Sequence, residues 1–326
     1  MKPFKVFSSF ALTGMLTISL AACGSSSTDK ASTTKKDVTE KITIGMSFPA
    51  ADHGWMGAVI QNAKDEAKKL GVEMVVSQAD NPNKQTNDVE DLITKKVDAV
   101  VLLPIETDSM TPVAKEVKDA KIPLFVFDRE LNNKDYTGLV KGDNSGIGKN
   151  AADFIGEELN GKGKVAIISS DPSSVNTLRV GGFTDEIKSK YPDLKVVANQ
   201  SGSFQKEKAY QVMQNVLQAN SHIDAVYTID DEMAIGVLQA IKEAKRDDIQ
   251  IVTGAGGFKD FYQAIKDSSD IELATFTYSP LMIKTAVDQA VDMAKGSAPD
   301  KQDTVLPAEQ VTKDNVDKYF DPNANY

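Results

Sequence analysis

The chain has 326 residues, 41% of them hydrophobic and 26% charged, which is typical of a folded soluble protein with room for two domains. Its 37 basic and 47 acidic side chains give a formal net charge of -10, and no basic run offsets it. Because phosphate backbones are negatively charged, this balance argues against nucleic acid as a partner.

The N-terminal segment differs from the rest of the chain. Lys2 and Lys5 precede an apolar run that ends at Leu20, and two alanines then lead to Cys23. This order predicts a secretory signal peptide over residues 1–22, since the apolar run is too short for a comfortable membrane span. Residues 23–40 are rich in Ser, Thr, Gly and charge, and they predict a flexible tether.

From Lys41 onward, short β-rich runs alternate with helical patterns. The predicted strands are 43–49, 73–78, 99–104, 123–128, 164–169, 195–199, 225–229, 249–253 and 273–278. The predicted helices are 55–71, 85–96, 110–121, 147–161, 179–191, 207–220, 231–245 and 281–296. This alternation predicts an α/β fold of parallel sheets that helices cover on both faces.

Two segments share one pattern. Residues 92–110 and 217–235 both run from a helix end through (V/I)-D-A-V into an apolar strand, an acidic loop and a new helix. The repetition predicts two similar α/β lobes rather than one long sheet.

Ligands of open parallel sheets bind outside the carboxyl ends of the strands, so the side chains there are candidates for a site. They are Asp52, His53, Trp55, Met56, Asp128, Arg129, Arg179, Phe204, Asp230, Gly256 and Tyr278. Aromatic rings cover the C–H faces of a sugar, while Asp accepts from and Arg donates to its hydroxyls. The set therefore predicts a neutral polyhydroxylated ligand, although Asp128 and Arg129 could instead form a local ion pair.

Several of these residues have a structural alternative. Trp55 could pack in the core, and Arg179 could be a solvated helix residue. For Phe204, a ligand contact and a structural role are equally open. Asp230 and Asp231 directly precede a helical pattern. We expect one of them to cap that helix and the other to face the ligand.

Motifs of catalysis and cofactor binding mostly fail. GDNSGIGKN (142–150) has the wrong spacing for a phosphate loop, and GAGGFK (254–259) lacks the third glycine of a dinucleotide fingerprint. With His53 and His222 far apart and one cysteine, a metal site is not expected. We therefore expect no cofactor and no enzyme activity, although a carboxylate pair of a glycoside-active enzyme stays open.

The region from Lys41 to Pro307 resembles the ribose-type periplasmic binding proteins of bacterial ABC sugar importers. DRELNN, GDNSGIGKNAADFI, FQKEKAYQVMQNVLQAN and above all IDDEMAIGVLQAI carry the resemblance. It implies the type I fold, in which two doubly wound lobes are joined by three crossovers near 142–143, 278–279 and 307–309. The lobes would be 41–142 plus 279–308, and 143–278 plus 309–326, with the ligand between them.

The resemblance also implies roles for the candidate residues. Trp55 and Met56 stand where relatives place paired aromatics, and Asp128, Arg129, Arg179 and Phe204 match ligand contacts of the family. Asp52 falls on a neighbouring polar contact and Tyr278 on a hinge-side position. Three departures stand out: Met56 replaces an aromatic, Leu103 an Asn, and Gly256 a ligand-binding Asp. The missing Asp, together with Asp230 in place of the usual Asn, argues against ribose itself.

The stretch LAAC (20–23) resembles the bacterial lipobox, although a buried or free Cys23 is the alternative. The resemblance implies a palmitate-bearing lipid anchor, a place on the extracytoplasmic face of the cell membrane, and permease and ATPase subunits as partners of a monomer. The expected function is binding of a monosaccharide or sugar alcohol for import. The alternative is a sugar or quorum-signal receptor that acts through a membrane sensor.

Overall fold

The computed structural model describes residues 41–51, 53–324 and 326. The predicted signal peptide, tether and lipidation site at Cys23 lie outside the described residues, and so does Asp52. Within the described ranges, no helix is both long and apolar enough to span a membrane. The described residues form two six-stranded sheets with helices between the strands, which confirms the predicted α/β fold of two lobes.

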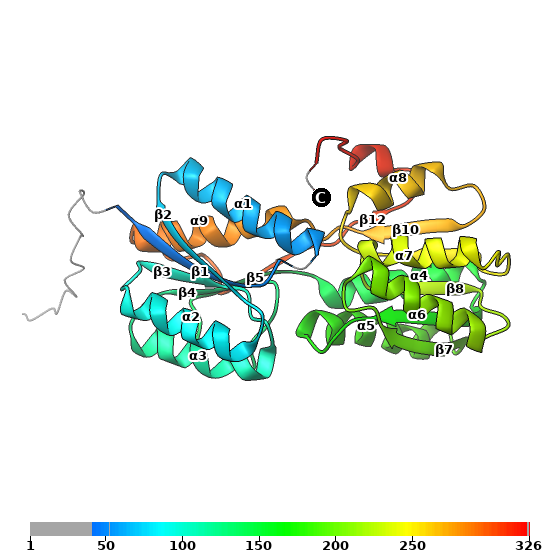
Figure 1. Cartoon of the computed structure of the whole chain (residues 1–326), viewed down its shortest axis with the longest axis horizontal. Helices are drawn as coiled ribbons and strands as arrows, with labels where there is room; N and C mark the ends of the chain where they lie inside the picture. Colours follow the sequence, from blue (N-terminus) through cyan, green and yellow to red (C-terminus); the bar gives the residue numbers. More distant parts are fainter. Residues whose placement is uncertain (1–40, 52, 325) are drawn as a thin grey trace, which may run out of the picture. The chain divides into compact units, whose positions relative to one another are not determined.

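The first sheet has the strand order β11-β5-β4-β3-β1-β2. Its strands are β1 (Thr43–Pro49), β2 (Glu73–Ala79), β3 (Ala99–Leu102), β4 (Leu124–Phe127), β5 (Gly138–Gly142) and β11 (Asp303–Leu306), and they pair in parallel. Helices cover both faces (Figure 1): α1 (Gly54–Leu70) with α9 (Ile283–Ala294), and α2 (Pro82–Thr94) with α3 (Thr107–Asp119). We call this sheet and its helices the first lobe.

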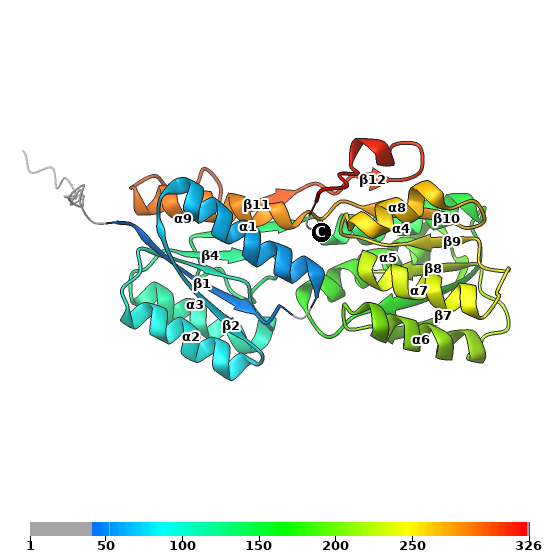
Figure 2. The same ribbon diagram turned by 45° about the horizontal axis from the view of Figure 1, so that its top comes forward.

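The second sheet has the order β12-β10-β9-β8-β6-β7. Its strands are β6 (Lys162–Ser169), β7 (Asp193–Ser201), β8 (Ala225–Thr228), β9 (Ile251–Thr253), β10 (Glu272–Phe276) and β12 (Gln310–Val311). Its helices are α4 (Asn144–Glu158), α5 (Ser174–Lys190), α6 (Lys206–Ala219), α7 (Asp231–Glu243) and α8 (Lys259–Asp267). Helix α4 packs against α5, while α7 lies between α6 and α8 (Figure 2); together they form the second lobe.

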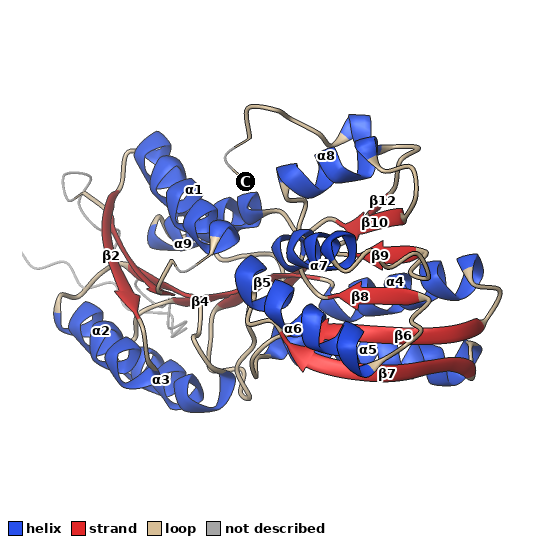
Figure 3. Cartoon of the chain, turned by 45° about the vertical axis from the view of Figure 1, so that its right-hand side comes forward, coloured by secondary structure: helices blue, strands red, loops and turns tan. Residues whose placement is uncertain are grey.

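The two lobes repeat one arrangement. The order β2-β1-β3-β4-β5 in the first sheet corresponds to β7-β6-β8-β9-β10 in the second. The arrows of β6, β7, β8 and β9 point the same way, so their carboxyl ends meet at one edge of the sheet (Figure 3). Only the last strand differs, because β11 is parallel to β5 whereas β12 is antiparallel to β10.

The repeated (V/I)-D-A-V sequence has the same physical role in both lobes. The Thr43 amide at the start of β1 donates to Asp98 Oδ2 at 2.9 Å, and the Lys164 amide in β6 donates to Asp224 Oδ2 at 2.7 Å. Each carboxylate thereby ties its own strand, β3 or β8, to the neighbouring central strand. The pattern detected in the sequence therefore marks a hydrogen bond that joins two strands in each sheet.

The chain passes between the sheets after β5, after β10 and after β11, which agrees with the three predicted crossovers. The nine predicted strands and eight predicted helices are all present with shifted ends. Missed were β5, β11, β12, α8 and the short 3-10 helices Pro280–Met282 and Val316–Lys318. These elements are short, and β5 has glycine at both ends. Their sequences therefore contain too few residues to show the hydrophobic periodicity of a helix or of a strand. The exact lobe boundaries stay a prediction.

Candidate functional site

A pocket lies where the carboxyl ends of the strands of both lobes meet. About 390 Å³ of space free of protein atoms lies in it, a figure that includes open solvent at its mouth. Its lining consists of His53, Trp55, Met56, Asp128, Arg129, Val175, Arg179, Phe204, Asp230, Ala255, Gly256 and Tyr278. The structure thus brings together every candidate residue that it describes. Val175 and Ala255 were missed because small apolar side chains give no chemical signal in a sequence.

Two aromatic side chains form apolar walls from opposite lobes. The Trp55 ring is stacked parallel to Phe127 with centroids 6.3 Å apart, and its Nε1 donates to the Tyr278 carbonyl at 2.9 Å. Trp55 is therefore both part of the core and part of the pocket wall. Phe204 comes from the loop before α6, where a backbone φ of 55° turns it, and its ring lies 5.9 Å from that of His53. Apolar walls of this kind suit the C–H faces of a ring or polyol.

Two arginines hydrogen-bond to backbone carbonyls of loops, and both also line the pocket. Arg129 Nη1 donates to the carbonyls of Pro104 and Ile105, at 3.3 and 2.6 Å, and its Nε lies 3.8 Å from Asp128 Oδ2. Arg179 Nη1 donates to the Ile229 carbonyl. Each guanidinium is thus held by the loop that follows the corresponding strand, β3 or β8.

The close approach of α4 and α5 sets the position of Arg179. A Cβ atom on Gly148 would lie 2.1 Å from the Arg179 carbonyl oxygen, so only glycine permits this packing. Arg179 Nε then reaches Asn144 Oδ1 at 2.9 Å, and the side chain is 3% exposed. The solvated-helix alternative for Arg179 is wrong, because the guanidinium is buried between the lobes.

A chain of hydrogen bonds runs from the first lobe through a crossover to the second. The Tyr278 hydroxyl donates to Asp128 Oδ1 and accepts from Asn144 Nδ2, and the Arg179 guanidinium lies 4.4 Å from the Tyr278 ring centroid. Burial raises the pKa of the Asp128 carboxyl, an effect that the neighbouring Arg129 opposes. This polar chain closes the hinge side of the pocket.

The acidic loop before α7 departs from the expectation that one aspartate caps and the other faces the ligand. Asp230 does both: its Oδ1 accepts from the Met233 amide at 3.0 Å, and it also lines the pocket. Asp231 turns away and accepts from the amides of Gly257 and Phe258 and the Thr275 hydroxyl. Burial raises the pKa of Asp230 to about 7 and that of Asp231 to about 6.

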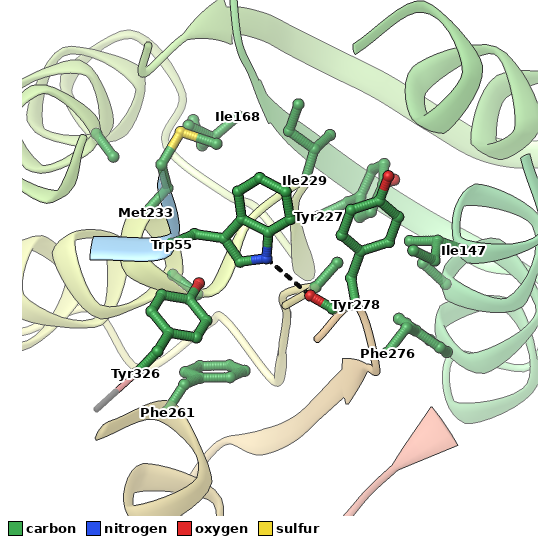
Figure 4. Packing of buried hydrophobic residues seen from close by; sticks show 14 of the residues in the cluster. Trp55, Ile147, Ile168, Tyr227, Ile229, Met233, Phe261, Phe276, Tyr278 and Tyr326 are labelled. Carbon is green, nitrogen blue, oxygen red and sulfur yellow. Dashed lines mark hydrogen bonds between the residues drawn. The ribbon is translucent and has the colours of Figure 1, made fainter. Parts of the chain in front are cut away.

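Gly256 leaves room that an aromatic side chain uses. Its φ is 149°, and a Cβ atom there would lie 2.9 Å from the hydroxyl of Tyr326. Tyr326 packs 5.0 Å from the Phe258 ring, and its buried hydroxyl has no hydrogen-bond partner within the described part of the chain. Figure 4 shows this ring between Phe261 and Trp55. Nothing in the sequence connects residue 326 with the loop at 256.

Comparison with known proteins identifies the family. A model of the periplasmic binding protein domain matches residues 44–298, which is most of the chain. This chain belongs to the periplasmic binding protein family. The predicted resemblance to sugar-binding members of that family, with the type I fold, is thereby confirmed.

Relatives of this periplasmic binding protein bind sugars and polyols. The galactofuranose-binding protein YtfQ of Escherichia coli (strain K12) is 34% identical over 80% of this chain and 85% of its own. A xylitol-binding protein of Mycolicibacterium smegmatis is 30% identical over 94% of this chain and 85% of its own. A solved ABC transporter solute-binding protein from Bacillus halodurans with bound myo-inositol is 27% identical, covers 88% of this chain and 98% of its own, and has a TM-score of 0.80. These relatives are binding proteins and not enzymes.

In residues 41–51, 53–324 and 326, no three His, Cys, Asp or Glu side chains gather as metal ligands would. The pocket of this periplasmic binding protein combines four aromatic side chains, two carboxylates and two guanidinium groups. That combination can hold a neutral ligand by apolar contact and by hydrogen bonds to its hydroxyls.

Proposed function

We propose that this periplasmic binding protein is the solute-binding subunit of an ABC importer, and that it binds a monosaccharide or a sugar alcohol in the pocket between its lobes. One observation carries the proposal: Trp55 and Phe204 line the same pocket as the Asp128, Arg129, Arg179 and Asp230 side chains. Relatives that bind galactofuranose, xylitol and myo-inositol support the ligand class.

The proposed ligand contacts divide by chemistry. The rings of Trp55 and Phe204 would cover apolar faces, with Met56 and Val175 filling between them. Asp128 and Asp230 would accept from ligand hydroxyls, and the arginines would donate to them. Charge-assisted hydrogen bonds contribute roughly 1.5–3 kcal/mol each, so a ligand lacking one hydroxyl would be rejected strongly. His53, Gly256 and Tyr278 complete the proposed set, together with Asp52.

Closing of the lobes, by rotation about the three crossovers, would bury the ligand and align the lobe surfaces for the permease and ATPase partners. We propose that the protein acts as a monomer on the extracytoplasmic face of the membrane, held by a lipid on Cys23. Replacing Cys23 with Ala should leave sugar binding unchanged and move the protein out of the membrane fraction. Membrane retention of that variant would argue against the anchor.

The test is a thermal-shift and calorimetry screen of residues 41–326 against pentoses, hexoses, alditols and inositols. A ligand at a hundredfold excess over its dissociation constant stabilises the folded state by about 2.7 kcal/mol. Phe204→Ala should weaken binding by roughly 10-fold or more. Phe320→Ala is the matched control, since Phe320 is also a half-buried phenylalanine but does not line the pocket.

The outcomes separate the alternatives. Saturable binding with the sugar recovered unchanged supports the binding protein, whereas turnover of an offered saccharide would indicate an enzyme. If no sugar or polyol of the panel binds, the result would contradict the proposal and favour a receptor for another signal molecule.

A further inference from the structure

Among the described residues, no side chain of the first lobe caps the start of helix α1. The residue before it, His53, contributes no side-chain bond to the first turn, and that turn contains no acidic residue. Two of the first backbone N–H groups nevertheless have partners. The amides of Gly54 and Trp55 donate to Glu232 Oε2 and Oε1, at 3.2 and 3.1 Å. Such N–H groups are unsatisfied within a helix and need an outside acceptor.

Glu232 belongs to the other lobe. It lies in the first turn of α7, and its side chain is 15% exposed. The carboxylate therefore stands between the N-termini of α1 and α7, where both helix dipoles favour negative charge. Gly54 permits the approach, because a Cβ atom at that position would lie 3.0 Å from Glu232 Oε1.

Glu232 contacts two residues of the pocket, Trp55 and also His53, whose Nδ1 lies 3.9 Å from Glu232 Oε1. Trp55 is held by its backbone amide to the second lobe and by its indole Nε1 to the Tyr278 carbonyl in a crossover. Glu232 itself is absent from the pocket lining, so it does not need to touch a ligand to affect binding.

We infer that Glu232 is a positioning residue that caps α1 across the cleft, and so couples closing of the lobes to placement of Trp55 against the ligand. This inference rests on the proposed function. Opening the cleft would return the Gly54 and Trp55 amides and the Glu232 carboxylate to water. The cap therefore stabilises only the closed arrangement, and its loss shifts the population toward the open one.

A second bond between the lobes provides an internal comparison. The Glu130 amide of the first lobe donates to Ser174 Oγ at the start of α5, at 2.9 Å. This is one neutral hydrogen bond, whereas Glu232 accepts two bonds as an anion. Charge-assisted hydrogen bonds are roughly twice as strong as neutral ones, so the Glu232 bridge dominates.

Amide hydrogen exchange of the protein saturated with xylitol or myo-inositol tests the cap directly, because the cap forms only when the lobes are closed. Glu232→Ala should speed exchange of the Gly54 and Trp55 amides at least about 10-fold, since each loses its acceptor. Glu207→Ala is the matched control: Glu207 also lies in the first turn of its helix, α6, but is exposed. Equal exchange in the sugar-bound wild type and the sugar-bound Glu232→Ala variant would overturn the inference.

Stopped-flow dissociation of xylitol or myo-inositol tests the coupling. Glu232→Ala should release the probe roughly 10-fold faster, and Glu232→Gln about 3-fold faster because one carbonyl oxygen can still accept. Ser174→Ala and Glu207→Ala should change the rate by less than about 3-fold. An unchanged rate in Glu232→Ala would show a cap without coupling and would overturn the inference. Failure of the wild type to bind either probe would count against the proposed function instead.

Discussion

The loops after β3 and β8 occupy equivalent places in the two lobes but have different uses. After β3, side chains of the same lobe hydrogen-bond the backbone of the loop. Gln85 bonds the Leu103 carbonyl and the Ile105 amide, and Arg129 bonds two carbonyls. After β8, three consecutive acidic residues face three directions: Asp230 the pocket, Asp231 the 256–258 loop, and Glu232 the first lobe. The same framework thus supports a structural loop in one lobe and a binding loop in the other.

The largest expected difference between the lobes lies in their arginines. Arg179→Ala should lower the stability of the ligand-free protein by about 3–5 kcal/mol, because it leaves Asn144 and the Ile229 carbonyl unsatisfied in a buried site. Arg129→Ala should lower the stability of the ligand-free protein less, since it removes hydrogen bonds at a partly exposed loop. Urea unfolding of both variants measures the difference, and equal losses would contradict it.

Asp230, the buried residue at the start of α7, should make stability depend on pH. Burial raises the folded-state pKa of Asp230 to about 7, so the folded protein holds a proton that the unfolded chain releases above pH ~4. Stability is therefore lost as the pH rises toward 7. Asp230→Asn keeps a capping side chain without the charge.

At pH 8 the Asp230→Asn variant should be more stable than the wild type by on the order of 2–4 kcal/mol, a difference that shrinks toward pH 4. Denaturant unfolding across this pH range is the measurement. A pH-independent difference would mean that Asp230 is not buried as a charged group.

The smallest effects should be similar in the two lobes. Asp98→Asn and Asp224→Asn each weaken a bond to a strand amide, and Asp224→Asn also weakens the exposed contact of Oδ1 with His222 Nε2 at 3.0 Å. Each variant should cost about 1 kcal/mol and leave sugar affinity unchanged. The two losses should add, because the sites lie in different lobes. Strongly unequal values would show that the repeated motif is equivalent in sequence only.

The sequence predicted features that depend on periodicity and on residue chemistry. The alternation of β-rich and helical segments is long and regular, so the two lobes and nearly all central strands followed from it. The candidate residues followed from polar and aromatic chemistry at strand ends, because parallel sheets bring those ends together. Arg179 and Phe204 were thereby placed at one pocket although no local pattern joins them.

Other features depend on contacts between residues far apart in the sequence, and no local sequence pattern reveals such contacts. Glu232 looked like part of a helix start, and its bonds to Gly54 and Trp55 appear only once the lobes are placed. Tyr326 meets Gly256 for the same reason. Asp230 and Asp231 could not be distinguished, because which neighbour caps a helix depends on the exact residue where the strand ends.

The pairing of β11 with β5 sets the order in which the molecule can fold. It joins Leu139 to Asp303, and the antiparallel partner of β10 follows only at Gln310. During synthesis, therefore, neither sheet can acquire its second edge strand, β11 or β12, until almost the whole chain has emerged. Contacts of such long sequence separation slow folding. Both lobes should gain their final stability together, in one late step.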